Sequence, residues 1–147
     1  MKDWRCQQLL VEFFHRLDGK KFDLLVDLFD EEGSWRRPTA LWRGRAEIAS
    51  AMAKRSATAV TRHLVSNFLV IEDRGDEVDA VASLTTYSID SGEHRELPIA
   101  VEAPLGVFRA SATFRCAGAK TSILRLDLRP ELTIRQGKWP SKARDLG

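Results

Sequence analysis

The order of two hydrophobic periodicities along this chain constrains its fold more than any other feature. Between residues 3 and 55, apolar residues recur every three to four positions, which is typical of amphipathic helices. From residue 60 onward, runs rich in β-branched and aromatic residues are separated by turn-forming residues. Helices followed by a series of strands predict an α+β fold, in which the helices collect on one side of a sheet.

Three helices are expected from this pattern. The first covers residues 3–19 and ends at the pair Asp18–Gly19, and the third covers residues 44–55. The second, within residues 20–30, places Phe22, Leu25, Val26 and Phe29 on one face. Residues 31–38 contain Gly and Pro and predict a short extended piece around Trp35.

Strands are expected within residues 61–72, 77–89, 96–116 and 121–130. The strand within residues 61–72 carries apolar side chains at both odd and even positions, so we expect both of its faces to be covered. The helices would cover one face, and a partner subunit or long loops the other. We expect a single domain over residues 1–130 and a polar, flexible tail over residues 131–147.

Charge and cysteine usage narrow the class of protein. The net charge is only +2, which argues against a dedicated nucleic-acid or membrane-surface binder. No apolar run approaches the roughly 20 residues needed to span a bilayer, and the charged N-terminal segment does not resemble a signal peptide. Cys6 and Cys116 lie far apart in the sequence and are expected to be free thiols, as in a cytoplasmic protein.

An ordered set of segments gives the chain a family resemblance. The segments FFHRLDGKKFDLLVDLF, GSWRRP, GRAEIASAM, TRHLVSNFLV and LRLDLRP resemble the SnoaL-like branch of the nuclear transport factor 2-like superfamily, from about Leu9 to Pro130. The resemblance implies a cone: a strongly bent mixed β-sheet with three N-terminal helices that enclose a pocket. It also implies a homodimer formed through the sheet face.

Asp18 and His63 are the candidate catalytic residues. A carboxylate in the last turn of a helix faces the negative end of the helix dipole, at a cost of about 0.3–1 kcal/mol, so Asp18 is expected to have a partner. The resemblance supplies His63, because scytalone dehydratase and hexachlorocyclohexane dehydrochlorinase carry an Asp/His pair at these positions. Such a carboxylate accepts one ring N–H, which leaves the other nitrogen able to take a proton from substrate. The alternatives are ordinary Asp-Gly turn chemistry and a purely structural pair.

Three further residues are predicted to bind substrate. Trp35 stands where many relatives have an aromatic residue at the pocket mouth or floor, Asn67 is on the same strand parity as His63, and Tyr87 is the only phenol, able to orient a carbonyl or hydroxyl. The chain also departs from the dehydratase pattern. The segment SLTTYSI lacks the second histidine of those enzymes, and Leu17 replaces a tyrosine, which argues against dehydration by paired histidines.

These features predict a cofactor-independent lyase or isomerase that abstracts a proton from a small hydrophobic or aromatic molecule, with no metal ion. Two alternatives are a non-catalytic small subunit of a ring-hydroxylating dioxygenase and a ligand-binding cone without catalysis. Asp127 is expected to pair with Arg125 or Arg129, although some polyketide cyclases of this branch use a late-strand carboxylate. The Arg- and Trp-rich segment 35–45 is expected to be a solvated loop, or to make cation–π packing at a subunit contact, rather than to bind nucleic acid.

Overall fold

The computed structural model describes residues 2–134, which form three helices and six strands. In chain order the elements are α1 (Lys2–Asp18), α2 (Phe22–Val26), β1 (Phe29–Arg37), β2 (Ala40–Arg43), α3 (Gly44–Ala53), β3 (Val60–Asp73), β4 (Glu77–Ile89), β5 (Gly106–Ala117) and β6 (Lys120–Thr133).

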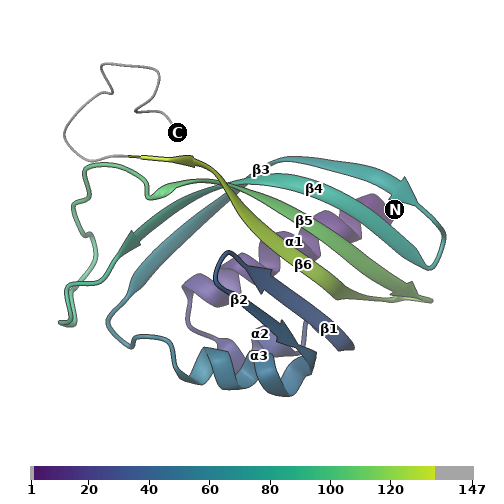
Figure 1. Ribbon diagram of the computed structural model, residues 1–147, viewed down its shortest axis with the longest axis horizontal. Coiled ribbons are helices and arrows are strands. Elements are labelled where there is room, and N and C mark those ends of the chain that lie inside the picture. Colours follow the sequence, from purple (N-terminus) through teal and green to yellow (C-terminus); the bar gives the residue numbers. More distant parts are fainter. Residues whose placement is uncertain (1, 135–147) are drawn as a thin grey trace.

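The six strands form one mixed sheet in the order β2-β1-β6-β5-β4-β3. Strands β1 and β6 are parallel, and every other neighbouring pair is antiparallel. Figure 1 shows the long strands β3 to β6 curving across the molecule, with the helices gathered on one side of the sheet. The α+β fold with a bent mixed sheet and N-terminal helices, predicted from the sequence, is therefore confirmed.

The core lies between α1 and the concave face of the sheet. The apolar stripe of α1 is buried there, as its helical spacing predicted. Phe13 makes edge-to-face contacts with Phe14, Phe29 and Trp35, at centroid distances of 4.9, 5.6 and 5.0 Å. These aromatic contacts fix the C-terminal half of α1 against β1 and thereby place Asp18, the last residue of the helix.

The strand β2 was not expected from the sequence, and several boundaries differ from the expectations, two of them by a large margin. Helix α2 ends at Val26, and Phe29 begins β1, where it pairs with Ile123 of β6 and is fully buried. Phe29 was expected on the helix; an aromatic side chain suits a buried strand equally well, and here the sheet partner decides. Within the segment expected to be a strand from residue 96, regular pairing begins only at Gly106.

A β-bulge at Asn67 explains part of the doubly apolar pattern of β3. Asn67 adopts a left-handed backbone conformation with φ of 53°, and the pairing of β3 with β4 changes register around it. One extra residue in a strand exchanges its two faces. The side chains that face the helices are therefore odd-numbered before the bulge and even-numbered after it, namely His63, Val65, Phe68 and Val70.

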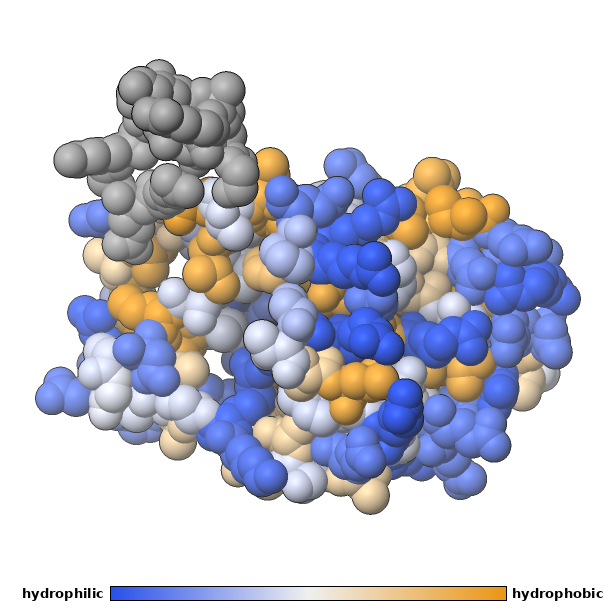
Figure 2. Space-filling view, in the orientation of Figure 1, coloured by the Kyte–Doolittle hydropathy of each residue, from blue (hydrophilic) through white to orange (hydrophobic). Residues whose placement is uncertain are grey.

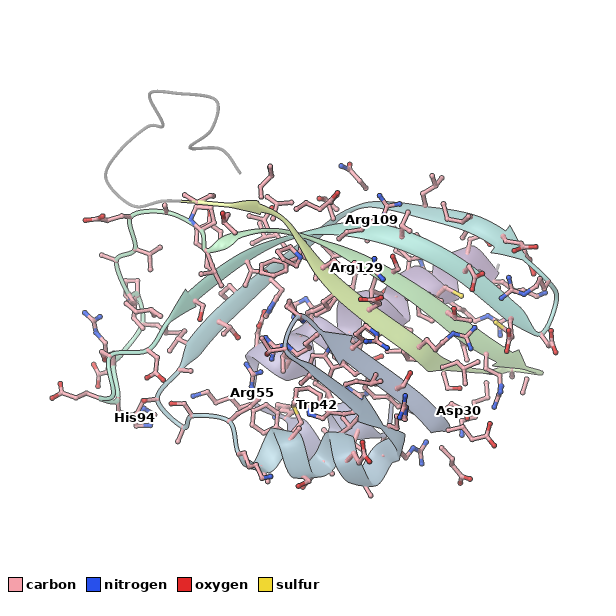
Figure 3. All side chains as sticks on the ribbon, in the orientation of Figure 1. Asp30, Trp42, Arg55, His94, Arg109 and Arg129 are labelled. Atoms are coloured by element: carbon pink, nitrogen blue, oxygen red, sulfur yellow. The ribbon has the colours of Figure 1, made fainter. Side chains whose placement is uncertain are left out.

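The outer face of the sheet carries apolar side chains on some strands and polar side chains on others. On β3 it carries Leu64, Leu69 and Ile71, which are 52%, 59% and 57% exposed, so nothing among residues 2–134 covers them. Over β5 and β6 the visible face is largely hydrophilic (Figure 2), and Arg109 and Arg129 lie there (Figure 3). Exposed apolar side chains therefore gather on the edge strand β3, although Leu132 of β6 is also 61% exposed.

The C-terminal strand extends past the domain boundary that was expected from the sequence. Strand β6 continues to Thr133, three residues past the domain boundary expected at residue 130, and Thr133 pairs with Gly106. The rest of the expected tail, residues 135–147, lies outside the described residues. Among residues 2–134, no helix is both long enough and apolar enough to cross a membrane.

Candidate functional site

Asp18 and His63 are in direct contact, although they come from α1 and β3. The Nδ1 atom of His63 lies 2.6 Å from Oδ1 of Asp18. The same Oδ1 accepts a hydrogen bond of 2.8 Å from the hydroxyl of Thr61, and Oδ2 accepts one of 2.8 Å from the backbone N–H of His63. The structure therefore brings together the two residues that the sequence suggested as a pair.

The contact is shielded from solvent and favours an ionised carboxylate. The side chains of His63 and Asp18 are only 11% and 12% exposed. Burial by itself would raise the pKa of Asp18, but the hydrogen bonds from His63 and Thr61 and the charge of His63 together hold this pKa below its ordinary value of 3.8. These bonds also compensate the unfavourable position of a carboxylate at the end of α1.

The hydrogen-bond pattern assigns the tautomer of His63. An ionised carboxylate only accepts hydrogen bonds, so Nδ1 must be the donor, and in the neutral ring Nε2 is then the unprotonated nitrogen. No residue among 2–134 hydrogen-bonds to Nε2 through its side chain or backbone. The ring of Phe14 lies 4.9 Å from the imidazole at an interplanar angle of 34°, and this contact fixes the orientation of the ring.

His63 forms part of the wall of a cavity of about 110 Å³ on the helix-covered side of the sheet. Apolar and polar side chains both line this cavity. The apolar residues are Leu17, Trp35, Pro38, Leu105, Phe108 and Leu128, and the polar ones are Arg37, Arg55, Thr61, His63, Thr86 and Ser88. A mainly apolar hollow with a few converging polar groups is the usual form of a small-molecule site.

Two arginines in this cavity were missed by the sequence reasoning. Arg37 is the last residue of β1, and Arg55 follows α3 in the segment that leads to β3 (Figure 3). Burial lowers the pKa of both guanidinium groups. The charge of Arg55 lowers the pKa of Arg37 further, whereas the charge of Asp18 raises the pKa of Arg55. An arginine remains protonated even so, and both groups keep a positive charge at neutral pH.

The sequence did contain a signal for Arg37. Trp35 faces the core, so strand alternation turns Arg36 outward and Arg37 inward. Treating all arginines between residues 35 and 45 as one surface loop obscured this alternation. Arg55 gave no comparable signal, because the sequence placed it at the end of the third helix, whereas α3 ends at Ala53.

Trp35 lines the cavity but lies deep in its wall. The side chain is fully buried and packs edge-to-face against Trp42 at 5.1 Å, and the guanidinium of Arg37 lies 5.7 Å from the centre of its ring. This cation–π contact lies within the chain, whereas the one expected in this segment was at a subunit contact. With no exposed ring face, Trp35 cannot stack on a nucleic-acid base.

Asn67 and Tyr87 do not line the cavity, and their expected positions need correction. Asn67 is exposed in the β-bulge, where its type is explained by the left-handed backbone, a conformation that asparagine tolerates better than most residues. Tyr87 pairs with Arg62 across β3 and β4 and faces the opposite side of the sheet from His63 and Thr86. There it lines a groove with Leu97 and other residues of the segment before β5.

Asp127 forms an ion pair and does not line the cavity. Its Oδ2 lies 3.2 Å from Nη2 of Arg129, in agreement with the ion pairing expected from the sequence. Among residues 2–134, no group of three or more His, Cys, Asp or Glu side chains is arranged to hold a metal ion.

Comparisons with known proteins agree with this fold. A family model described as a SnoaL-like domain matches residues 3–140. Three similar solved structures are ActVI-ORFA from Streptomyces coelicolor, an NTF2-like protein with a cystatin-like fold from Novosphingobium aromaticivorans, and a protein with a cystatin-like fold from Nostoc punctiforme. No curated protein sequence matches the chain.

The three structures share the fold at low sequence identity. ActVI-ORFA is 16% identical with a TM-score of 0.68, over 86% of this chain and 94% of that one. The Novosphingobium protein is 21% identical with a TM-score of 0.68, over 95% and 84% of the two chains. The Nostoc protein is 16% identical with a TM-score of 0.69, over 86% and 88%.

Proposed function

Because this chain belongs to the SnoaL-like domain family, we propose that it is a cofactor-independent lyase or isomerase that abstracts a proton from a small hydrophobic or aromatic molecule. His63 is the base, and Asp18 holds it in position. The observation that carries this proposal is the 2.6 Å contact between Nδ1 of His63 and Oδ1 of Asp18 at the wall of a cavity.

The pair has the parts that a general base requires. Asp18 accepts a hydrogen bond from the Nδ1–H of His63. The lone pair of Nε2 is therefore available to take a proton from a substrate C–H. As Nε2 takes the proton, the imidazole becomes a cation, and the ionised carboxylate stabilises this charge. Asp18 is itself held by Thr61 and by the backbone of β3, so it does not have to move during the reaction.

The electron pair of the broken C–H bond decides the outcome. In an elimination it forms a carbon–carbon double bond while a leaving group departs with its own bonding pair. In an isomerisation it shifts along the substrate, and the protonated His63 returns the proton to another carbon. Both reactions conserve atoms and electrons with no oxidant, reductant or further reactant.

The cavity supports a small substrate. Its volume of about 110 Å³ is of the order of the cavity of roughly 150 Å³ that accommodates benzene in another protein. The wall formed by Trp35, Phe108 and Leu128 is apolar and suits an aromatic ring or a short aliphatic body.

Solvent hydrogen exchange tests the base assignment with small probe molecules in place of the natural substrate. A panel of small aromatic and alicyclic ketones and acids, each with an activated C–H, is incubated in D₂O with the protein, and deuterium uptake is followed by NMR. We expect uptake with the wild type and its loss in His63→Ala. The matched control is His15→Ala, because His15 is an exposed residue of α1 and does not line the cavity. Equal uptake by His63→Ala and the wild type would contradict the assignment and favour a cone without catalysis.

Homodimer formation through the sheet face belongs to the same proposal. It is supported by the exposed apolar residues Leu64, Leu69 and Ile71 on the outer face of β3. Apolar side chains on an edge strand usually need a cover, because they otherwise promote uncontrolled association.

A further inference from the structure

Two partly buried positive charges stand in the cavity without an ion-pair partner. Arg37 and Arg55 both line it; the charge of Arg55 lowers the pKa of Arg37, and the charge of Asp18 raises that of Arg55. None of the ion pairs formed among residues 2–134 includes either arginine, and neither guanidinium donates a side-chain hydrogen bond within that range. Partly desolvated cations of this kind are costly unless something pairs with them.

The groups already present do not meet this requirement. Trp35 offers its ring face to Arg37, but a cation–π contact leaves the N–H donors of the guanidinium unused. Asp18 is the acid whose charge acts on Arg55, and its two oxygens already accept bonds from Thr61 and from the ring and backbone of His63. The two guanidiniums therefore offer several donors and positive charge to whatever occupies the cavity.

We propose that the ligand of this cavity carries a carboxylate that binds between Arg37 and Arg55, while its apolar body packs on Leu105 and Phe108. The planar fork of N–H donors on each guanidinium matches the two oxygens of a carboxylate. The cavity volume limits the body to about one ring or a short chain, so the substrate class is a small aromatic or alicyclic acid.

This inference rests on the proposed function for its chemical meaning: the ion pair anchors one end of the substrate and presents a C–H of the apolar body to Nε2 of His63. Anchoring at a site away from the reacting atoms is a common way to position a substrate for proton transfer. The binding itself does not depend on the reaction and can be measured without it.

Benzoate and benzamide make a matched pair of probes, because they have nearly the same shape and differ in charge. Each is titrated into the ¹⁵N-labelled protein, and the dissociation constant is read from NMR shifts of the Thr61 and His63 amides. We expect benzoate to bind at least about tenfold more tightly than benzamide to the wild type, since a hydrogen bond to a charged group typically contributes a factor of about 10 to 100. Arg37→Gln and Arg55→Gln should each remove most of this preference, and Arg37→Lys should keep part of it.

The control is Arg36→Gln, which removes the same charge one residue away from an exposed side chain on the opposite face of β1. It should leave the preference for benzoate unchanged. Far-ultraviolet circular dichroism and thermal melting verify that each variant is folded. Equal binding of the two probes to the wild type, or an unchanged preference in both glutamine variants, would overturn the proposal.

The outcome is separable from that of the proposed reaction. In His63→Ala, the base is removed but both arginines remain, so benzoate should still bind in preference to benzamide. If His63→Ala abolishes deuterium uptake and the wild type shows no preference for benzoate, the base assignment stands and the carboxylate site does not. If the preference is present but uptake is insensitive to His63, the reverse holds.

Discussion

Replacing Asp18 by asparagine should destabilise the fold by about 2–5 kcal/mol near neutral pH. The amide can keep its oxygen at the position of Oδ1, where it still accepts from Thr61 and from Nδ1 of His63. Its NH₂ group then takes the position of Oδ2 and faces the backbone N–H of His63, donor against donor. The energetic consequence follows from these three contacts.

The magnitude is built from their typical values. An unsatisfied buried donor costs about 1–3 kcal/mol, and each of the two remaining bonds loses about 1 kcal/mol when its acceptor is no longer charged. Removing a negative charge from the end of α1 returns about 0.3–1 kcal/mol. A domain of this size is typically stable by about 5–15 kcal/mol, so the variant should still fold.

The pH dependence gives this prediction a second signature. Asp18 has a lower pKa in the folded protein than its ordinary value of 3.8, so its stabilisation is fully present above that value and is lost as pH falls through the lower, folded pKa. The cost of Asp18→Asn should therefore persist from neutral pH into mild acid and shrink only below about pH 4.

Urea unfolding of the two proteins at several pH values measures the cost directly. The control is Asp27→Asn, because Asp27 is exposed and its side chain makes no hydrogen bond or ion pair within residues 2–134. Its substitution should change the free energy of unfolding by no more than about 0.5 kcal/mol. A cost below about 1 kcal/mol for Asp18→Asn, or a cost that does not shrink in acid, would refute the reasoning.

Three further predictions concern other parts of the chain. Asn67→Gly should leave the free energy of unfolding nearly unchanged, and Asn67→Val should lower it by about 1–2 kcal/mol in chemical unfolding, because only glycine suits a φ of 53°. Neither substitution should alter benzoate binding, and a loss of binding would show that Asn67 contributes to the site. Burial and the neighbouring Cys116 thiol raise the pKa of Cys6 to about 12. A thiol reagent at mildly alkaline pH should therefore modify Cys116 in the folded protein and Cys6 only after unfolding. Rapid modification of the folded Cys116→Ser variant would contradict this, because it would show that Cys6 is accessible. If Leu64 and Leu69 form a dimer interface, Leu69→Glu should halve the mass found by light scattering and Glu93→Gln should not, whereas a monomeric wild type would exclude the dimer.

The sequence located Asp18 and His63 because each is tied to a well-defined element boundary. Asp18 ends a helix whose apolar stripe fixes its rotation, and His63 is near the start of a strand. The family resemblance then supplied the convergence of the two, which periodicity alone does not provide. The resemblance also placed Trp35 at the mouth or floor of the pocket, and its side chain lines the cavity from a fully buried position.

The position of Tyr87 was predictable but was overlooked. In β4 the even-numbered residues Val78, Ala80, Ala82 and Leu84 are apolar and buried, so an odd-numbered residue faces the other side. Continuing this alternation to the end of the strand places Tyr87 away from His63. A single strand with a consistent parity carries enough information for such a prediction.

Asn67 was beyond this kind of reasoning. Strand parity is informative only while the pairing is regular, and the bulge at Asn67 exchanges the two faces within one strand. Asparagine is enriched in left-handed conformations but also occurs in ordinary polar positions, so its presence does not identify a bulge. The doubly apolar pattern of β3 was therefore attributed entirely to a covered sheet, whereas the bulge accounts for part of it.

The way Asp18 is held separates its structural role from that of His63. The bonds from the Thr61 hydroxyl and from the backbone N–H of His63 would tie α1 to β3 with any side chain at position 63. The imidazole adds one more bond, but it also places a polar ring in a cavity wall where an apolar residue would pack without that cost. A purely structural link thus explains Asp18 and Thr61 and leaves the histidine unexplained. We therefore expect His63→Ala to destabilise the fold by less than Asp18→Asn does, and the opposite order in urea unfolding would identify the pair as structural.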